Sequence, residues 1–138
     1  MNDKTFCKRD AEGLTYAGDH LLIELWGAQN LTDPVYIQEA LEACAQAAKT
    51  TILHSYYHPF GPNQGVSGAT IISESHISIH TWPEYSFASI DCYMCGDCDV
   101  KATLPIIEEK FCPTEMETQI IKRGFNLTRE GKNERVAL

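Results

Sequence analysis

Two stretches of the chain repeat apolar residues at helical spacing. From Val35 to Lys49, apolar side chains recur every three or four positions, after cap-type residues and a proline in residues 30–34. This is the pattern of a capped amphipathic helix. Residues 101–111 repeat the pattern, with Pro105 in the first turn, where proline is tolerated. The sequence therefore predicts two helices, each with one apolar side.

Shorter apolar segments predict strands. Residues 20–26 and 51–57 are rich in aliphatic, β-branched and aromatic side chains, a composition typical of strands. Residues 67–73 and 77–81 are predicted as strand, on either side of Glu74 and Ser75, and further strands follow at 87–94 and 117–124. The order β-α-β-β-β-α-β favours an α+β fold: a two-layer α/β sandwich, with a mainly antiparallel sheet and two helices on one face.

Polar and apolar residues alternate after Ser75. His76, Ser78 and His80 are separated by isoleucines, so a strand places two histidines and a hydroxyl on one face. This pattern is equally that of a strand with a solvated outer face, although titratable groups beside a turn also suit acid–base chemistry. On the next predicted strand, Cys92 shares the apolar face and is expected in the core.

The composition indicates one small domain spanning residues 1–138. With 43% hydrophobic and 22% charged residues, the chain has the make-up of a soluble globular protein. No stretch approaches the ~20 apolar residues that span a bilayer, and the polar start MNDKTFCKRDAEG lacks the apolar run of a secretory signal. We therefore expect a cytoplasmic protein without a membrane partner.

The charge argues against nucleic acid as a partner. The net charge is −8 and the chain has only 11 lysines and arginines, whereas a phosphate-binding surface needs clustered cations. Without a secretory signal, the six cysteines are expected as reduced thiols.

Three cysteines follow one another at metal-ligand spacing. Cys92, Cys95 and Cys98 form half of a possible metal site, but no second Cys/His pair follows at a suitable distance. We therefore predict no metal, and one reactive thiol among packing thiols. A non-catalytic metal- or thiol-binding module, built on these cysteines and the histidines, remains the alternative of another class.

Three consecutive motifs resemble one enzyme family. They are Gly65-Val-Ser-Gly68, then Ile72-Ser-Glu-Ser-His-Ile-Ser-Ile-His-Thr-Trp-Pro-Glu-Tyr85, then Ile90-Asp-Cys-Tyr-Met-Cys-Gly96. In this order they closely resemble the prokaryotic S-adenosylmethionine decarboxylase proenzyme family, which is pyruvoyl-dependent. The resemblance implies conversion of S-adenosylmethionine to its decarboxylated form and CO₂, for polyamine (spermidine) biosynthesis. Relatives with the same machinery decarboxylate arginine or ornithine, which are the alternative substrates.

The resemblance also implies self-cleavage. The bond between Glu74 and Ser75 would break after an N→O acyl shift and β-elimination, leaving a β chain of residues 1–74 and an α chain of residues 75–138. Ser75 would become a covalent pyruvoyl group, the only cofactor, which forms a Schiff base with the substrate amine. Such a carbonyl supplies the electron sink that no ordinary side chain provides.

The remaining site residues follow from the same motifs. The resemblance assigns His80 as the base in processing, Ser67 as a second processing residue and Cys95 as the proton donor in decarboxylation. It further implies a homo-oligomer of αβ units.

The resemblance places the substrate pocket around Trp82, Glu84 and Phe60. An aromatic face suits adenine or a sulfonium cation, and a carboxylate suits ribose hydroxyls or positive charge. The ordinary alternatives are a core tryptophan and a solvated glutamate before a turn.

Strand geometry adds one expectation. Ser75 and His80 are five residues apart, so one uninterrupted strand would point them to opposite faces. We therefore expect a bend or bulge near Ser75 and His76 that brings both groups into one site, together with a strained peptide that would favour the acyl shift.

Overall fold

A computed structural model describes residues 7–126, and its centre is one antiparallel sheet of six strands in the order β4-β5-β6-β7-β3-β8. Each neighbouring pair is antiparallel. The strands are β3 (Gly18–Trp26), β4 (Ile52–Pro59), β5 (Val66–Ile72), β6 (Ser75–Trp82), β7 (Phe87–Cys95) and β8 (Glu115–Arg123).

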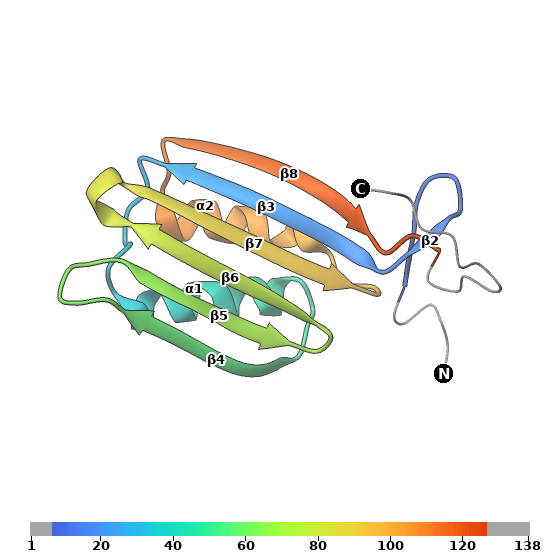
Figure 1. The fold of residues 1–138 in the computed structure, drawn as a ribbon, viewed down its shortest axis with the longest axis horizontal. Coiled ribbons are helices and arrows are strands. Elements are labelled where there is room, and N and C mark those ends of the chain that lie inside the picture. Colours follow the sequence, from blue (N-terminus) through green and yellow to red (C-terminus); the bar gives the residue numbers. More distant parts are fainter. Residues whose placement is uncertain (1–6, 127–138) are drawn as a thin grey trace, which may run out of the picture.

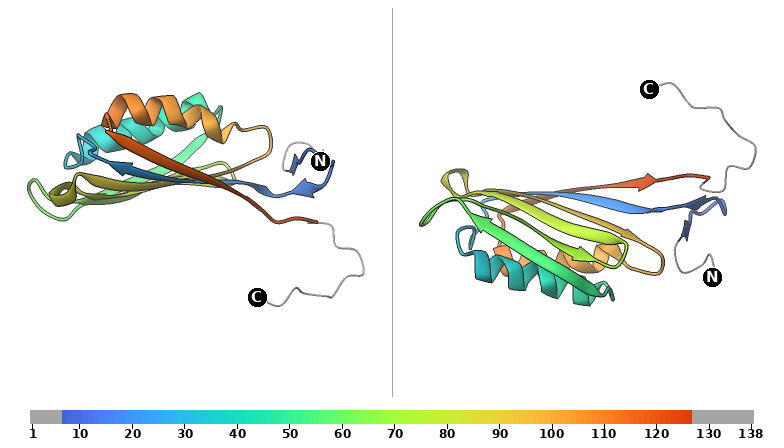
Figure 2. Two further views of the ribbon diagram at one scale, coloured as in Figure 1. Left: turned by 90° about the horizontal axis from the view of Figure 1, so that it is seen from above. Right: turned by 60° about the horizontal axis from the view of Figure 1, so that its bottom comes forward.

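Two helices, α1 (Pro34–Ala47) and α2 (Thr103–Phe111), cover one face of this sheet (Figures 1 and 2). The predicted two-layer α+β sandwich is therefore confirmed. Helix α1 begins where the sequence indicates, because the Asp33 carboxylate caps it by accepting hydrogen bonds from the amides of Val35 and Tyr36.

The sheet has one strand more than the predicted order. Residues 67–81 were expected as strand interrupted at Glu74 and Ser75, but they form a hairpin of two strands, β5 and β6, in which Ile72 pairs with Ser75. The turn consists of Ser73 and Glu74 alone. A two-residue connection reverses the chain, so the same segment supplies two neighbouring strands.

Smaller elements complete the described chain. Near its start lie the short paired strands β1 (Lys8–Arg9) and β2 (Thr15–Tyr16). Single 3₁₀ turns at Pro83–Tyr85 and Val100–Ala102 precede β7 and α2. No helix among residues 7–126 has both the length and the apolar character needed to cross a bilayer.

The core lies between the sheet and the helices. Inward side chains alternate with outward ones along β3, β6 and β7, as the sequence predicts, and Cys92 is fully buried. Large side chains that are fully buried include Leu21, Ile23, Leu25, Ile37, Leu41, Ile72, Ile77, Ile79, Met94, Ile107 and Phe111.

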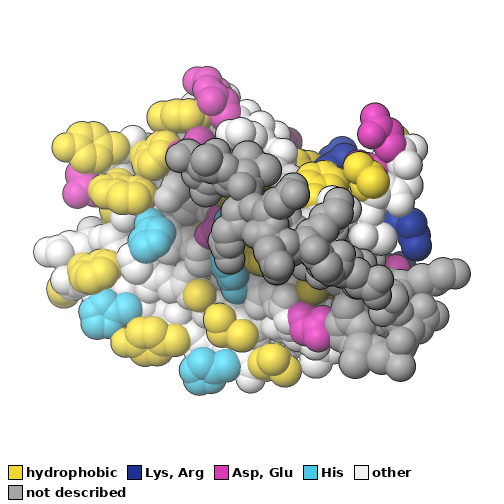
Figure 3. All heavy atoms as spheres, turned by 45° about the vertical axis from the view of Figure 1, so that its right-hand side comes forward, with side chains coloured by type: hydrophobic (Ala, Val, Ile, Leu, Met, Phe, Trp, Pro, Cys, Tyr) yellow, Lys and Arg dark blue, Asp and Glu magenta, His cyan; other side chains and the backbone are white. Residues whose placement is uncertain are grey.

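The other face of the sheet is open in the described chain. The polar side chains that alternate with the core residues lie on this face, including His76, Ser78 and His80 on β6. Figure 3 shows histidine and hydrophobic side chains gathered on this face. The same alternation that fills the core thus leaves chemically active groups on the opposite side.

Candidate active site

The hairpin turn between β5 and β6 brings a hydroxyl onto a peptide carbonyl. The Ser75 hydroxyl lies 2.6 Å from the carbonyl oxygen of Glu74. Glu74 has φ 63°, in the left-handed region, which costs a non-glycine residue roughly 1 kcal/mol. The left-handed backbone falls on Glu74, the residue whose carbonyl faces the hydroxyl, and not on Ser75 and His76, where strain was expected.

Cys95 joins this turn from the end of β7. Its sulfur lies 3.6 Å from the Ser75 hydroxyl and 3.3 Å from the Glu74 carbonyl oxygen. A cavity of about 270 Å³ opens beside these groups. Its lining residues are Lys49, Thr50, Thr51, Ser73, Glu74, Cys95, Asp97 and Cys98.

The bend expected near Ser75 and His76 is absent, so that expectation was wrong. Strand β6 pairs with β5 from Ser75 to His80 without a shift in register, and with β7 from His76 to Trp82. A bulge in β6 would interrupt hydrogen-bond ladders on both sides. Ser75 and His80 therefore lie about 16 Å apart along a straight strand.

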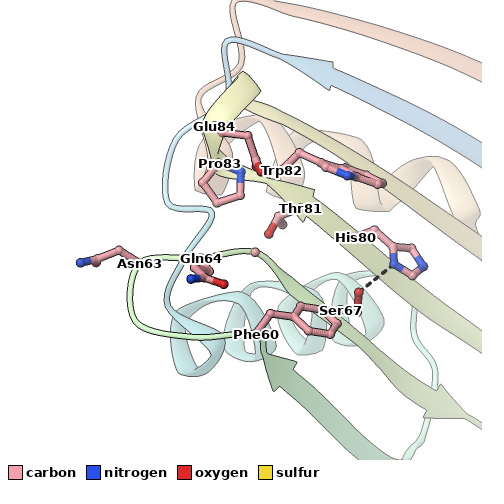
Figure 4. A pocket seen from close by; sticks show the side chains of 10 residues that line it. Phe60, Asn63, Gln64, Ser67, His80, Thr81, Trp82, Pro83 and Glu84 are labelled. Atoms are coloured by element: carbon pink, nitrogen blue, oxygen red, sulfur yellow. Dashed lines mark hydrogen bonds between the residues drawn. The ribbon is translucent and has the colours of Figure 1, made fainter.

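A second group of predicted residues meets at the other end of β6. The Ser67 hydroxyl lies 2.8 Å from Nδ1 of His80, across the β5–β6 pair. Beside them is a cavity of about 670 Å³ that also contains Phe60, Trp82 and Glu84 (Figure 4). The rest of its lining is Asn63, Gln64, Gly65, Thr81 and Pro83.

Thr81 holds the backbone under this cavity. Its buried hydroxyl accepts a hydrogen bond from the Val66 amide at 2.8 Å and donates one to the Leu31 carbonyl at 2.8 Å. Gly65 is required beside it, because a Cβ there would lie 2.5 Å from the Thr81 carbonyl oxygen. One hydroxyl and one glycine thus fix the loop that carries Phe60 against the strand that carries Trp82.

The two aromatic side chains of this cavity are open to solvent. Trp82 is 40% exposed and Phe60 is 60% exposed. Trp82 also contacts Phe87, with ring centroids 5.5 Å apart. The alternative that Trp82 is a core residue is therefore wrong, and its ring is free to contact a ligand.

A third group, not predicted as a set, is centred on Asp91 in the middle of the open face. His20 and His76 approach the same carboxylate oxygen with Nε2 at 2.7 and 2.8 Å, and the Ser78 hydroxyl donates to the other oxygen. Burial alone would raise the pKa of Asp91, but the hydrogen bonds from His76, Ser78 and His20 lower it far below its ordinary value.

The same contacts favour the charged form of His76. Its hydrogen bond to Asp91 raises the pKa of His76, against the opposing effects of burial and of the Arg123 charge. The Asp91 carboxylate therefore favours the charged imidazolium form of His76, the residue that follows Ser75 in the chain.

The ligand atoms of His20, His76 and Asp91 lie within 4.8 Å of one another, close enough for a metal ion. The guanidinium of Arg123, however, lies 3.3 Å from Nδ1 of His20. Because arginine can only donate, Nδ1 accepts and Nε2 carries the proton that points at Asp91. This tautomer is wrong for a metal ligand at Nε2, so the contacts favour a hydrogen-bonded network.

The cysteines do not join this group. Cys92 faces the core, on the side of β7 opposite to Cys95. The one set of three possible metal ligands within residues 7–126 contains no cysteine.

Nothing in the sequence around His20 identified it as a functional residue. It reaches Asp91 because β3 pairs with β7, where His20 lies opposite Tyr93. These strands are separated by α1 and three other strands, so their pairing could not be inferred from local alternation. The alternation did place Asp91 on the same face as Cys95, without identifying its partners.

Known proteins match this chain over most of its length. The family described as S-adenosylmethionine decarboxylase matches residues 19–124. Proteins named S-adenosylmethionine decarboxylase proenzyme from Thermomicrobium roseum and Clostridium botulinum are 40% and 41% identical to it, over 78% and 80% of this chain and 94% and 97% of theirs. The protein of that name from Methanococcus maripaludis is 42% identical, over 78% of this chain and 90% of its own.

A solved structure agrees with these matches. The adenosylmethionine decarboxylase of Aquifex aeolicus is similar with a TM-score of 0.71 at 32% identity, over 85% of this chain and 97% of that one.

Proposed function

This chain belongs to the S-adenosylmethionine decarboxylase family, and on that basis we propose that it is a self-cleaving proenzyme whose product decarboxylates S-adenosylmethionine. The polyamine (spermidine) pathway is the role that follows from the family. The observation that carries the proposal is the contact between the Ser75 hydroxyl and the Glu74 carbonyl, 2.6 Å apart on a strained turn.

The turn is suited to break the bond between Glu74 and Ser75. The Ser75 oxygen adds to the Glu74 carbonyl carbon, the C–N bond breaks, and an ester remains between the two residues. Removal of the Ser75 α-proton by a base then expels the Glu74 carboxylate. The products are a β chain of residues 1–74 and an α chain whose first residue is a dehydroalanine. Water then hydrolyses the imine form of this residue, its nitrogen leaves as ammonia, and a pyruvoyl group remains at position 75.

The residues at the new chain end fit a pyruvoyl group derived from Ser75. Such a group supplies the carbonyl electron sink that α-decarboxylation needs. The Cys95 thiol, 3.6 Å from the Ser75 oxygen, is placed to deliver a proton beside that position. Proton transfer requires donor and acceptor within hydrogen-bond reach, and no other thiol of the described residues makes a hydrogen bond to the turn.

The cavity around Trp82 suits the rest of the substrate. S-adenosylmethionine presents a purine, two ribose hydroxyls and a sulfonium cation. The exposed rings of Trp82 and Phe60 offer stacking and cation–π contacts, and the Glu84 carboxylate can accept hydrogen bonds from ribose. This set fits a nucleoside better than it fits arginine or ornithine.

The two halves of this site are too far apart in one chain. His80 pairs with Ser89 on β7, six residues before Cys95, so His80 and Cys95 lie about 20 Å apart on the same open face. A base at His80 cannot reach the α-proton of Ser75 in its own chain. A substrate in the Trp82 cavity likewise cannot reach Cys95 of that chain.

A twofold dimer removes this difficulty. If two open faces pack about an axis near the middle of β7, the Cys95 end of one chain lies over the His80 end of the other. Such an isologous interface makes each contact twice. Each site would then combine Ser75 and Cys95 from one protomer with Ser67, His80 and Trp82 from its partner. We propose this homodimer of αβ units as the active form.

Two measurements test the proposed function. Purified protein should give two bands of roughly half length on a denaturing gel, and processed protein should release CO₂ from carboxyl-labelled S-adenosylmethionine. Arginine and ornithine, supplied at the same concentration, should release little. A single stable 15.4 kDa species would contradict self-cleavage, and faster release from either amino acid would contradict the substrate.

A further inference from the structure

Strand β7 ends in the sequence Cys95-Gly-Asp-Cys98, and the proposed function uses only the first of these thiols. We propose that Cys95 and Cys98 form an oxidisable dithiol, which closes to a disulfide within the α chain and so removes the proton donor. This inference rests on the proposed role of Cys95. It assigns a modification site to a cysteine that the decarboxylation itself does not need.

The backbone brings the two cysteines within bonding range. Gly96 and Asp97 form a turn directly after β7, and Gly96 has φ 65°, in the left-handed region that favours glycine. Cys95 and Cys98 are therefore the first and fourth residues of the turn, whose Cα atoms lie within about 7 Å. Disulfides join Cα atoms at roughly 4.4–6.8 Å, so the turn places the two backbones in range. The Cys98 side chain packs against the core, so its sulfur must rotate toward Cys95 for the bond to close.

The cysteines share one cavity and both are accessible. Cys95 and Cys98 line the same cavity of about 270 Å³, and each is partly exposed. An oxidant that enters this cavity can reach both sulfurs. Access and a neighbouring resolving thiol are the two features of cysteines that respond to oxidants.

Two of the other cysteines are unsuited to this reaction. Cys44 and Cys92 are fully buried. Burial raises the pKa of the Cys44 thiol to about 12, and it also raises that of Cys92, so both stay protonated. Cys112 is exposed, but it follows α2 and lines neither this cavity nor the turn.

Cys7 is the one competitor among the described cysteines. It shares a neighbouring cavity of about 450 Å³ with Gly96 and Asp97. A disulfide from Cys7 would join the β chain to the α chain after cleavage, whereas a bond between Cys95 and Cys98 stays within the α chain. The two reactions therefore give different products on a gel.

The order of events follows from the environments of the two thiols. Burial and the neighbouring Cys95 raise the pKa of Cys98, with Lys8 opposing them, so the Cys98 thiolate is disfavoured, and we assign the first attack to Cys95, which lies at the turn. The Cys95 thiolate attacks hydrogen peroxide, which gives a sulfenic acid and a hydroxide that is protonated to water. The Cys98 thiol then attacks that sulfur and expels a second water. Two thiols lose two electrons and two protons, and the hydrogen peroxide is reduced.

The disulfide has a direct effect on the proposed reaction. A sulfur in a disulfide carries no proton, so the reacting carbon has no donor. Loss of a general acid costs about a hundredfold or more in rate. Reduction by a dithiol restores both thiols, so the loss is reversible.

The test treats processed enzyme with hydrogen peroxide and then follows three signals. The α chain should lose the mass of two hydrogens, the chains should separate on a non-reducing gel, and CO₂ release should fall about a hundredfold. Dithiothreitol should restore it. The variant Cys98→Ser should decarboxylate normally when untreated. Under peroxide its Cys95 lacks the resolving thiol and should gain two or three oxygens, as a sulfinic or sulfonic acid, with a loss that dithiothreitol does not reverse. Cys112→Ser should behave as the unmodified enzyme.

Three results would overturn the inference. They are an α chain of unchanged mass, a β–α crosslink that Cys7→Ser abolishes, or the loss of two hydrogens in Cys98→Ser. Failure of the proposed function has a different signature, because uncleaved protein or an absence of CO₂ release shows before any peroxide is added. The mass of the segment that forms the α chain shows whether the disulfide has formed, even in a protein that does not turn over substrate.

Discussion

Ser75 and His80 lie at opposite ends of one unbroken strand, with the register of β6 continuous on both sides between them. The residue before which we propose cleavage and the residue proposed as its base therefore cannot meet in a single chain. The proposed dimer resolves this, and it makes a prediction about pairs of inactive variants.

Coexpression of two processing-defective chains should restore cleavage of one of them. Ser75→Ala lacks the nucleophile and His80→Ala lacks the base, so each should stay intact alone. In a mixed dimer, the Ser75 of one chain faces the His80 of the other, and the His80→Ala chain should be cut. A denaturing gel with differently tagged chains measures this. If the mixture stays as intact as the separate variants, the composite site is wrong.

Ser75→Ala should abolish cleavage without unfolding the protein. The only group removed is the hydroxyl that lies 2.6 Å from the Glu74 carbonyl. Ser73→Ala provides a matched control, because Ser73 is exposed in the same turn, and the Ser75 hydroxyl is the one hydroxyl of the described residues that donates to the Glu74 carbonyl. Intact mass after incubation should show one chain for Ser75→Ala and two for Ser73→Ala. Cleavage in both would assign the nucleophile to another group.

Cys95→Ala should separate processing from turnover. The thiol contacts the turn but is not the group that adds to the carbonyl, so most cleavage should remain. Decarboxylation should fall about a hundredfold or more, because a general acid is lost. CO₂ release per cleaved chain measures the effect, with Cys112→Ala as the control. Undiminished release would require a different proton donor.

Asp91→Asn should destabilise the protein in a pH-dependent way. The raised pKa of His76 gives stability that is present below its ordinary value of 6.5 and fades as pH rises through the raised value. The lowered pKa of Asp91 gives stability that is present above its ordinary value of 3.8 and fades as pH falls through the lowered value. The loss of unfolding free energy caused by Asp91→Asn should therefore be largest between the two ordinary pKa values, from pH 3.8 to pH 6.5.

At its largest this deficit should be about 1–2 kcal/mol, since the exposure of His76 weakens the pair. Urea unfolding at pH 5.5, inside this range, and at pH 9, above it, compares the losses of stability. Both proteins carry Ser75→Ala as a common background, so that one intact chain unfolds. Protein concentration is kept constant, because assembly adds to stability. An equal deficit at both values would mean that the charge of His76 plays no part.

Thr81→Val should lower stability more than Thr81→Ser. Valine leaves the Val66 amide and the Leu31 carbonyl without their partner in a buried position, at a cost of about 1–3 kcal/mol. Serine keeps the hydroxyl and loses only a methyl group. The free energy of unfolding, measured in urea for both variants, checks the difference, and equal losses would assign the effect to packing.

Local pattern was sufficient for much of this protein. Helical spacing placed α1, and alternation put Ile77, Ile79 and Cys92 in the core and His76 on the open face. These features depend on residues close together in the chain, whose side chains must face either the core or solvent. The motifs around Ser75 were likewise enough to point to the family.

Tertiary structure decided how the parts of the site meet. The pairing of β3 with β7 brought His20 to Asp91, and the straight course of β6 kept Ser75 away from His80. Both depend on hydrogen-bond ladders between strands distant in the chain, whose order is set by closing one sheet over one core. A pattern of period two states which side chains share a face, but it contains no information about which strand lies alongside.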